Sequence, residues 1–485
     1  MKRFAQMLFV IAVVAALALH GRAQGPAASA RTAEIDKIFA RWNAATPGCA
    51  VGARTSGATD VFAAYGMADL EHDVRNTPET IFEAGSVAKQ FTATAVLLLA
   101  RDAKLSLEDP VRKFIPEVPD YGTPITIRQM LSHTSGLRDW GNITGIAGWP
   151  RGTRTHAHEH VLDVLTRQKA LNFTPGTRWS YSNSGYNLAA ILVTRVSGMS
   201  FAEFSRVRIF EPLGMRHTSW RDDFTRIVKH RAVAYVPEGQ NYSMQMPFEN
   251  VHGNGGLLTT VGDLLTWNAH LVAPRIGDAA MVKEQQTPVR FPSGREHGYG
   301  LGLVVGDYKG VREVSHGGAT AGYRAFLVQY PDRGVSIAVL CNAANANPTQ
   351  YAHAVAELLL GSAIKADAAL ASPVPEAQGP LTALKRDASF NPRGDALADF
   401  AGTYTSDEAE TTLIVSIESD ALIVRRRPAS RIVLRPLLKD TFESDGDLGT
   451  IMFRRDAAGR VGELSVIQDR VWDLRFKKQA AASNP

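Results

Sequence analysis

A change of pattern near residue 366 divides the chain into two parts and limits the folds that each part can adopt. Residues 366–394 contain prolines and many alanines but few large apolar residues, a composition typical of a linker. Helical and strand-like patterns precede this segment, whereas only short β-rich runs follow it. A chain of 485 residues is also too long for one compact core. We therefore expect one domain over 24–365 and a smaller one over 395–480.

The larger part has an α+β order of elements. A helix is predicted over 32–43, because its apolar residues recur with helical spacing, and two strand-like runs follow at 47–55 and 59–69. Helical and loop patterns fill the middle. Four further strand-like runs and a last helix close this part: 299–306, 312–318, 323–331, 335–342 and the helix at 351–361. We expect the first and last strands to meet in one antiparallel sheet flanked by helices.

The smaller part reads as an all-β domain. Its β-rich runs are separated by turn residues at intervals of about ten residues, which is typical of a small barrel or sandwich. These runs are 400–406, 411–419, 421–427, 431–437, 450–456, 462–469 and 470–476. Both the barrel and the sandwich remain open from the sequence.

The N-terminal segment resembles a secretory signal peptide. Two positive charges precede an apolar run over 7–19, which is too short to span a bilayer, and Gly21 and Ala23 are small residues suited to cleavage. We expect residues 1–23 to be removed after Ala23. The mature protein is then periplasmic or secreted, without a stable membrane anchor.

Charge and cysteine content bear on nucleic-acid binding and on disulfide formation. The net charge of +5 comes from 53 basic and 48 acidic residues. Because the two signs are interspersed along the chain, the charge does not indicate a nucleic-acid-binding surface. Cys49 and Cys341 are the two cysteines, and each lies in an apolar strand-like run. They are either two buried thiols or one disulfide bridge. The sequence carries no signal for an oligomeric state.

Ser86 and Lys89 form an S-x-x-K motif at a predicted helix start. Gly85 precedes the serine and an apolar helical pattern follows, so residues at i and i+3 share one face. A lysine of lowered pKa can take the proton of a neighbouring hydroxyl, and a helix N-terminus offers N–H groups to an oxyanion. The same spacing at Ser362 and Lys365 lies at the end of a helix before the linker, and we interpret that copy as structural.

Two later motifs add residues of the same chemistry. Tyr181 and Asn183 form a Y-x-N motif in a turn-rich loop before an apolar helix; tyrosine can act as an acid or base, and asparagine can hold a lysine and an amide. His316 precedes Gly317 and Gly318 on a predicted strand, where glycines let another backbone approach, such as that of a substrate. Singly each motif is weak; their combination predicts a serine site.

In this order the motifs resemble those of the penicillin-recognising serine hydrolases, which include class C β-lactamases, D,D-peptidases, D-aminopeptidases and esterases. The stretches LSHTSGL at 131–137, EPLGM at 211–215 and GNGGLLTTVGDLLTW at 253–267 are also similar to that family. The resemblance covers about residues 30–362. It implies a β-lactamase/transpeptidase-like fold and no cofactor.

The resemblance also implies roles for the motif residues. Ser86 would be the nucleophile and Lys89 would share its proton. Tyr181 would act as acid and base, although which of Lys89 and Tyr181 is the general base stays open. The backbone N–H groups of Ser86 and Ala319 would form the oxyanion hole. The implied substrate-binding residues are Asn183, His316, Gly317, Gly318 and Ala319.

One departure from the family pattern concerns His316, where a typical class C β-lactamase has lysine. Histidine, with an ordinary pKa of about 6.5, is mostly neutral at pH 7 and gives a substrate carboxylate no permanent cation. The variant resembles D-aminopeptidases and esterases more than efficient penicillinases. The smaller domain likewise resembles the lipocalin-like barrels appended to D-aminopeptidases.

We therefore expect a serine acyl hydrolase that acts through an acyl-Ser86 intermediate on a small-molecule or peptide substrate, namely a D-amino-acid peptide, a simple ester or a β-lactam. The alternative is a catalytically silent relative that binds peptidoglycan fragments or a protein partner. The segment THAHEH, with histidines at 156, 158 and 160, has spacing that zinc could use, but we interpret it as a solvated helix start and expect no metal.

Overall fold

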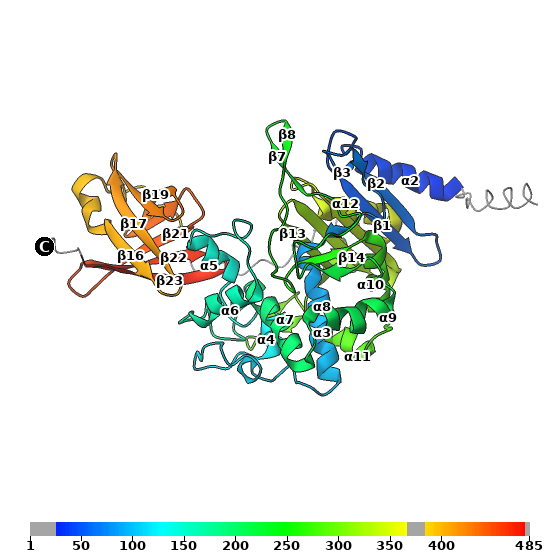
Figure 1. Ribbon diagram of the computed structural model, residues 1–485, viewed down its shortest axis with the longest axis horizontal. Coiled ribbons are helices and arrows are strands. Elements are labelled where there is room, and N and C mark those ends of the chain that lie inside the picture. The colour runs from blue at the N-terminus through cyan, green and yellow to red at the C-terminus, as the bar shows by residue number, and fades with distance from the viewer. Residues whose placement is uncertain (1–25, 366–383, 481–485) are drawn as a thin grey trace, which may run out of the picture.

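The computed structural model describes residues 26–365 and 384–480, and these form an α+β domain followed by a β-barrel (Figure 1). The predicted fold class is thereby confirmed. The predicted signal peptide and residues 366–383 of the predicted linker lie outside the described residues. Residues 384–394, at the end of that linker, already contact the barrel: Asp387 N–H donates to the Leu437 carbonyl over 2.8 Å, and the Phe390 and Phe442 rings lie 5.8 Å apart.

A six-stranded antiparallel sheet organises the larger domain, with the strand order β12-β13-β14-β15-β1-β2. The N-terminal strands therefore join the C-terminal ones, as the order of elements in the sequence predicted. The strands are β1 (Cys49–Thr55), β2 (Val61–Tyr65), β12 (Val304–Tyr308), β13 (Val311–Thr320), β14 (Tyr323–Tyr330) and β15 (Val335–Cys341).

The register between β1 and β15 pairs the two cysteines. Cys49 lies directly opposite Cys341, and their sulfur atoms form a disulfide that joins β1 to the neighbouring strand β15 across 292 residues of sequence. Of the two alternatives open from the sequence, the bridge is the one found, and neither side chain is exposed.

Helices cover both faces of the sheet. Helices α2 (Pro26–Ile38) and α12 (Pro348–Leu360) pack on one face, and α10 (Val261–Val272) and the buried helix α3 (Lys89–Arg101) belong to the core on the other. The remaining helices are α4 (Ile127–Leu131), α5 (Trp140–Ile146), α6 (His158–Thr166), α7 (Asn183–Ser197), α8 (Phe201–Ser205), α9 (Glu211–Leu213) and α11 (Ala279–Gln285).

Nine short strands of the described residues form four small sheets of their own. They are β3 (Met67–Asp69), β4 (Val74–Arg75), β5 (Phe82–Glu83), β6 (Ser219–Trp220), β7 (Tyr235–Glu238), β8 (Asn241–Met244), β9 (Leu257–Thr259), β10 (Val289–Arg290) and β11 (Glu296–His297). They pair as β3-β4, β5-β9-β6, β7-β8 and β10-β11. Within the described ranges, no single helix has the length and apolar character needed to cross a membrane. Helix α7 and the helical segment 201–213 meet these criteria only as a pair bent by 82°.

The C-terminal domain is a closed barrel of eight strands, which decides between the predicted barrel and sandwich. Buried and less buried residues alternate along strands such as β17, as expected when one face lines the interior. The strands are β16 (Gly402–Ser406), β17 (Thr411–Glu418), β18 (Ala421–Arg426), β19 (Ser430–Leu438), β20 (Thr441–Ser444), β21 (Thr450–Arg455), β22 (Val461–Gln468) and β23 (Val471–Lys478). The sequence prediction missed the short strand β20.

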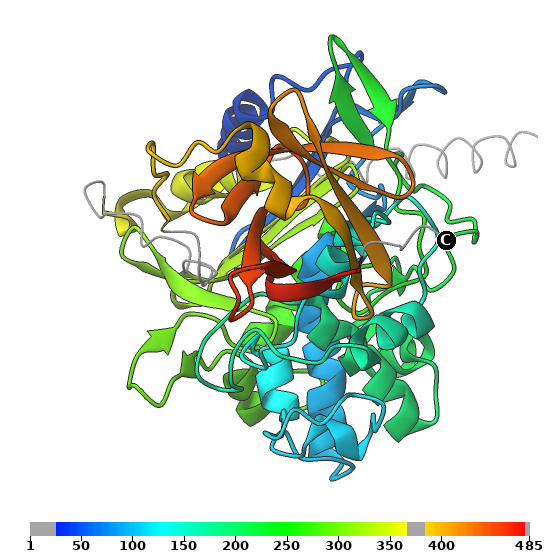
Figure 2. The same ribbon diagram turned by 90° about the vertical axis from the view of Figure 1, so that its left-hand side faces the viewer.

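The barrel rests on the helical side of the larger domain, against α5 and the loops beside it (Figures 1 and 2). Arg138 and Glu408 form an ion pair across this interface, 2.7 Å long, with side chains only 2% and 9% exposed. Arg426 donates to the carbonyls of Gly145 and Ile146 at the end of α5, each over 2.6 Å. These buried polar contacts fix the position of the barrel relative to the helices, because each would be costly to break.

Candidate active site

The serine of the S-x-x-K motif lies where the chain enters its most buried helix. Residues Gly85–Ala88 form one 3-10 turn, and α3 begins at Lys89. Gly85 has a φ of +51°, a conformation that favours glycine. Ser86 is half-buried and borders a pocket, so its hydroxyl is held at a rigid turn with access to solvent. The predicted helix start at Ser86 is confirmed.

Strand β13 passes so close to this turn that only glycine fits at one position. A Cβ atom added to Gly318 would lie 2.0 Å from the Ala84 carbonyl oxygen and 3.1 Å from the Ser86 nitrogen. The predicted close approach of a backbone is therefore made by the chain itself at Gly318, rather than by a substrate. It places the backbone at Ala319 beside the turn that carries Ser86, and both residues line the same pocket.

The side chain of Lys89 is fully buried and has three acceptors around its nitrogen. Nζ lies 3.2 Å from Ser86 Oγ, 2.9 Å from Asn183 Oδ1 and 2.7 Å from the Asn254 carbonyl oxygen. Burial, and after it the positive charge of Arg470, lower the pKa of Lys89 well below its ordinary value. A neutral amine has two N–H groups for Asn183 and Asn254, which leaves its lone pair for the proton of Ser86.

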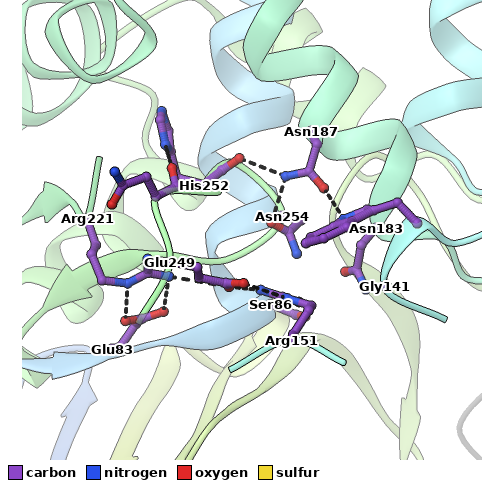
Figure 3. Close-up of polar contacts among 12 residues, drawn as sticks. Glu83, Ser86, Gly141, Arg151, Asn183, Asn187, Arg221, Glu249, His252 and Asn254 are labelled. Carbon is purple, nitrogen blue, oxygen red and sulfur yellow. Dashed lines mark hydrogen bonds and ion pairs between the residues drawn. The ribbon is translucent and has the colours of Figure 1, made fainter. Parts of the chain in front are cut away.

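Asn187 and Asp139 hold in place the two residues, Asn254 and Asn183, that carry two of these acceptors. Asn187 on α7 donates to Asn254 Oδ1 over 2.8 Å and to the His252 carbonyl over 2.9 Å (Figure 3). Asp139, at the start of α5, accepts from both the backbone N–H and the side-chain amide of Asn183, at 2.7 and 2.9 Å. Asn183 therefore presents its oxygen to Lys89, because its nitrogen is held by Asp139.

Tyr181 closes the pocket over Lys89. The Lys89 nitrogen lies 4.8 Å from the centre of the Tyr181 ring, and the Arg470 guanidinium lies 4.7 Å from the same ring centre. The ring is half-buried and packs against His133 with ring centres 4.3 Å apart. The structure thus brings the predicted residues Ser86, Lys89 and Tyr181 to one pocket.

His316 has both ring nitrogens engaged within the protein. A chain of hydrogen bonds that begins at His133 fixes which nitrogen of His316 carries the proton. His133 Nδ1 accepts from the Ser182 N–H (3.2 Å), so the proton of His133 is on Nε2, which donates to Tyr299 Oη (3.2 Å). Tyr299 in turn donates to His316 Nε2 (3.0 Å), which leaves the proton on Nδ1 for the Gly317 carbonyl (2.6 Å).

The same surroundings keep His316 uncharged. Burial, and then the charge of Lys89, lower the pKa of His316 to about 4, and the side chain is only 5% exposed. The expectation that this position supplies no permanent cation at pH 7 agrees with this pKa. With both nitrogens occupied, the imidazole positions β13 and Tyr299 and offers no free N–H to a ligand.

One wall of the pocket rests on a buried ion-pair network (Figure 3). Arg221 donates to both carboxylate oxygens of Glu83, at 2.9 and 3.2 Å, and lies 3.7 Å from Glu249. Glu249 also pairs with Arg151, which lines the pocket. Because Glu83 lies on β5, three residues before Ser86, the network anchors the strand that leads into the catalytic turn.

The pocket around Ser86 has a volume of about 520 Å³, and residues of both domains line it. Three arginines contribute to its lining, and the barrel supplies one of them, Arg470. The lining residues are Gly85, Ser86, Arg151, Tyr181, Asn183, Asn254, Gly255, His316, Gly317, Gly318, Ala319, Thr320, Arg324, Ala325, Pro348, Thr349 and Arg470. All of the predicted site residues line the pocket except Lys89, whose side chain is buried beneath the pocket surface.

Several residues of the site were not singled out in the sequence. His133 and Asn254 lie in LSHTSGL and GNGGLLTT, two stretches noted for their family resemblance, so a signal for them was present. Asp139 follows the first of these stretches by two residues. Arg470 has no local signal, because it reaches the site only through the docking of the barrel.

The histidines of THAHEH do not converge on a metal position. Helix α6 begins in this segment with Glu159 and His160 exposed, as expected of a solvated helix start, whereas His156 before the helix is fully buried. His158 Nε2 lies 2.9 Å from the His252 carbonyl, and His160 Nδ1 accepts from the Ala157 N–H. Among the described residues, one group of three or more His, Cys, Asp or Glu side chains has its ligand atoms within 4.8 Å of one another: Asp69, Glu71 and His72, apart from the Ser86 pocket.

Comparison with known proteins decides the family. The family model named Beta-lactamase matches residues 35–361. The chain belongs to the beta-lactamase family. A penicillin-binding protein of Bacillus subtilis is 30% identical over 307 residues, which are 60% of this chain and 66% of that protein. The chain thus spans slightly less than two thirds of the length of this relative.

Two further comparisons extend over both domains. A D-aminopeptidase of Brucella canis is 26% identical over 492 aligned residues, covering 87% of this chain and 93% of that protein. The octameric penicillin-binding protein homologue from Pyrococcus abyssi superimposes with a TM-score of 0.62, 23% identity and coverage of 93% and 99%. The second likeness, which covers 93% of the chain, shows that this fold recurs in a solved structure.

Proposed function

We propose that this chain is a serine acyl hydrolase that cleaves amide bonds of small peptides or peptide-like amides through an ester on Ser86. The observation that carries the proposal is the fully buried Lys89 amine, 3.2 Å from Ser86 Oγ and held by two further acceptors. A lysine that only capped a helix would have no reason to be desolvated beside a pocket serine.

Acylation follows from this arrangement. Ser86 Oγ attacks the carbonyl carbon while its proton passes to the neutral Lys89 Nζ, and the carbonyl electron pair moves onto oxygen. The N–H groups of Ser86 and Ala319 stabilise this oxyanion. When the C–N bond breaks, the leaving amine receives a proton through Tyr181, and the acyl group remains on Ser86.

Deacylation reverses the roles. A water molecule attacks the acyl ester and gives a proton to the Tyr181–Lys89 pair, a second oxyanion forms, and the C–O bond to Ser86 breaks. Ser86 Oγ takes the proton back, and a carboxylic acid leaves. The centre of the Tyr181 ring lies 4.8 Å from the Lys89 nitrogen, and we assign the proton transfers to these two groups as a pair.

The substrate we propose is an amide with a D-configured residue, and a simple ester is the second choice. The relatives named D-aminopeptidase support the first choice. Penicillins are less suitable substrates, because the strand beside Ser86 offers a neutral His316 in place of a permanent cation. We also propose a periplasmic or secreted location, supported by the signal-like N-terminus and by a disulfide, since disulfides persist in oxidising compartments.

The test is the intact mass of the protein after exposure to a fluorophosphonate. We expect one adduct on the wild type and none on Ser86→Ala. Ser362→Ala is the matched control, because it removes the serine of the second S-x-x-K motif, and it should label like the wild type. An unlabelled wild type would refute the proposal and favour the silent relative that only binds peptidoglycan fragments or a protein.

A further inference from the structure

His133 contacts the chain on both sides of Tyr181, the proposed acid and base. The Ser180 N–H donates to the His133 carbonyl over 3.0 Å, and the Ser182 N–H donates to His133 Nδ1 over 3.2 Å. The imidazole also packs against the Tyr181 ring, with ring centres 4.3 Å apart. One residue therefore restrains the backbone before Tyr181, the backbone after it, and the side chain itself.

Tyr181 lies in a segment that depends on such contacts. Helix α6 ends at Thr166 and α7 begins at Asn183, and no helix or strand lies between these two described helices. A segment of this kind has no regular ladder of hydrogen bonds to hold a side chain within about 0.5 Å of a productive geometry. The position of Tyr181 must therefore come from neighbouring segments, and His133 supplies two backbone contacts and a ring contact.

His133 is itself fixed to the central sheet. Its side chain is only 1% exposed, and its backbone φ of +60° is a left-handed conformation that histidine and asparagine adopt more readily than most residues. Its Nε2 donates to Tyr299, which donates to His316 on β13. Because β13 is paired with β14 around His316, the chain of hydrogen bonds ties the Tyr181 segment to the strand of the oxyanion hole.

Traced to its two backbone ends, this chain of hydrogen bonds runs in one direction. One end is the Ser182 N–H, which can only donate, and the other is the Gly317 carbonyl, which can only accept. Each imidazole between them must accept at one nitrogen and donate at the other, which only a neutral ring can do. Burial above all lowers the pKa of His133 well below its ordinary value and so keeps this ring neutral.

We propose that His133 is a positioning residue for the proton transfers of Tyr181, which it holds in place through the backbone of Ser180 and Ser182. His133 does not line the Ser86 pocket, so it acts through Tyr181 and not on the substrate. The inference rests on the proposed hydrolase function and adds a residue to its machinery. A histidine that only filled the core would affect every catalytic step alike, whereas a positioning residue affects the steps that need Tyr181.

Hydrolysis of p-nitrophenyl acetate separates these steps. In acylation Ser86 takes the acetyl group, its proton passes to Lys89, and p-nitrophenolate leaves as an anion that needs no proton from Tyr181. The ratio kcat/KM reports this step, whereas kcat includes deacylation, in which the Tyr181–Lys89 pair takes a proton from water. In His133→Ala we expect kcat to fall about 100-fold, the usual cost of a misplaced catalytic group, with kcat/KM within about threefold of the wild type. Intact mass should then show acetylated enzyme during turnover.

Two further variants make the test independent of the folding of His133→Ala. His133→Asn retains an acceptor for the Ser182 N–H and tolerates the left-handed backbone, so it should regain at least about tenfold of the lost kcat. Tyr299→Phe keeps the aromatic ring but removes both of its hydrogen bonds, so it should lower kcat about tenfold in the same selective way.

His270→Ala is the matched control. His270 is also 1% exposed, and its Nδ1 accepts the Arg275 N–H over 3.0 Å, but it lies on α10 and outside the pocket lining. This variant should keep both kcat and kcat/KM.

Equal losses of kcat and kcat/KM in His133→Ala would overturn the proposal, and so would a kcat equal to that of His270→Ala. A His133→Asn enzyme no faster than His133→Ala would also overturn it, as would a wild type that the fluorophosphonate labels but that does not turn the ester over. An unlabelled wild type would instead refute the hydrolase function itself, so the two failures are distinguishable.

Discussion

The contact between β13 and the Ser86 turn makes a steric prediction about Gly318. A methyl group added there would lie 2.0 Å from the Ala84 carbonyl oxygen, whereas a carbon in contact with such an oxygen stays at about 3.3 Å. In Gly318→Ala the two backbones must therefore separate by roughly 1 Å. The Ser86 and Ala319 N–H groups lie on opposite sides of this gap, so they can no longer converge on one oxyanion.

The expected loss can be estimated from catalysis in general. Misplacing reacting groups by about 1 Å costs about 100-fold, and losing one oxyanion donor costs about 100- to 1000-fold, or roughly 2.7–4 kcal/mol. We expect the second-order rate of fluorophosphonate labelling of Gly318→Ala to fall within this range. Thermal unfolding measured by circular dichroism would show that the variant is folded.

The adjacent glycine provides the control. A Cβ atom added to Gly317 would come no closer than 3.7 Å to Phe326, which is ordinary contact. Gly317→Ala should therefore label within about threefold of the wild type, well short of the loss of a donor. If Gly318→Ala were folded and labelled as fast as Gly317→Ala, the placement of the oxyanion hole between β13 and the Ser86 turn would be wrong.

Three other predictions concern the groups around this turn. Asp139→Ala should slow labelling at least about tenfold and destabilise the fold by about 1–2 kcal/mol, because it frees Asn183 and removes the N-terminal cap of α5, with chemical denaturation as the second measurement. Activity should fall as pH decreases through the pKa of Lys89, since the protonated amine accepts no proton, and in Arg470→Gln this acidic limb should move to higher pH, because a charge that lowers the pKa is gone; an unmoved limb would contradict the pairing. Replacing Cys49 and Cys341 together by alanine should cost about 2–5 kcal/mol of unfolding free energy in denaturant titrations, and no loss would mean that the bridge contributes nothing.

The sequence was sufficient for much of the fold, because its signals there are local. The strands of the central sheet follow from short apolar runs between turn residues, and the helix at Ser86 from apolar periodicity. Strand β20 was missed because its four residues include a single strongly apolar side chain, Phe442, and an aspartate stands at either side. The pairing of Cys49 with Cys341 depends on register between distant strands, which local patterns do not contain.

In the candidate site, too, some features follow from local motifs and others only from tertiary contacts. Ser86, Lys89, Tyr181 and Asn183 belong to motifs whose spacing is visible in the sequence, and the structure brings them together. Two details depend on tertiary contacts instead. Both nitrogens of His316 are bonded internally, which follows from the positions of Tyr299 and β13, and the approach of Arg470 follows from the docking of another domain.

Asp139 gives the barrel a share in the active site. Its carboxylate holds Asn183, and its own N–H is held by the Arg470 carbonyl. Deleting the barrel would therefore not simply uncover the pocket: it would remove the acceptor of this N–H and the carboxylate partner of the neighbouring Arg138. The two domains therefore cannot be exchanged independently of each other during evolution. A barrel transplanted from a relative would restore this enzyme only if its last hairpin and the segment at 138–148 were inherited together.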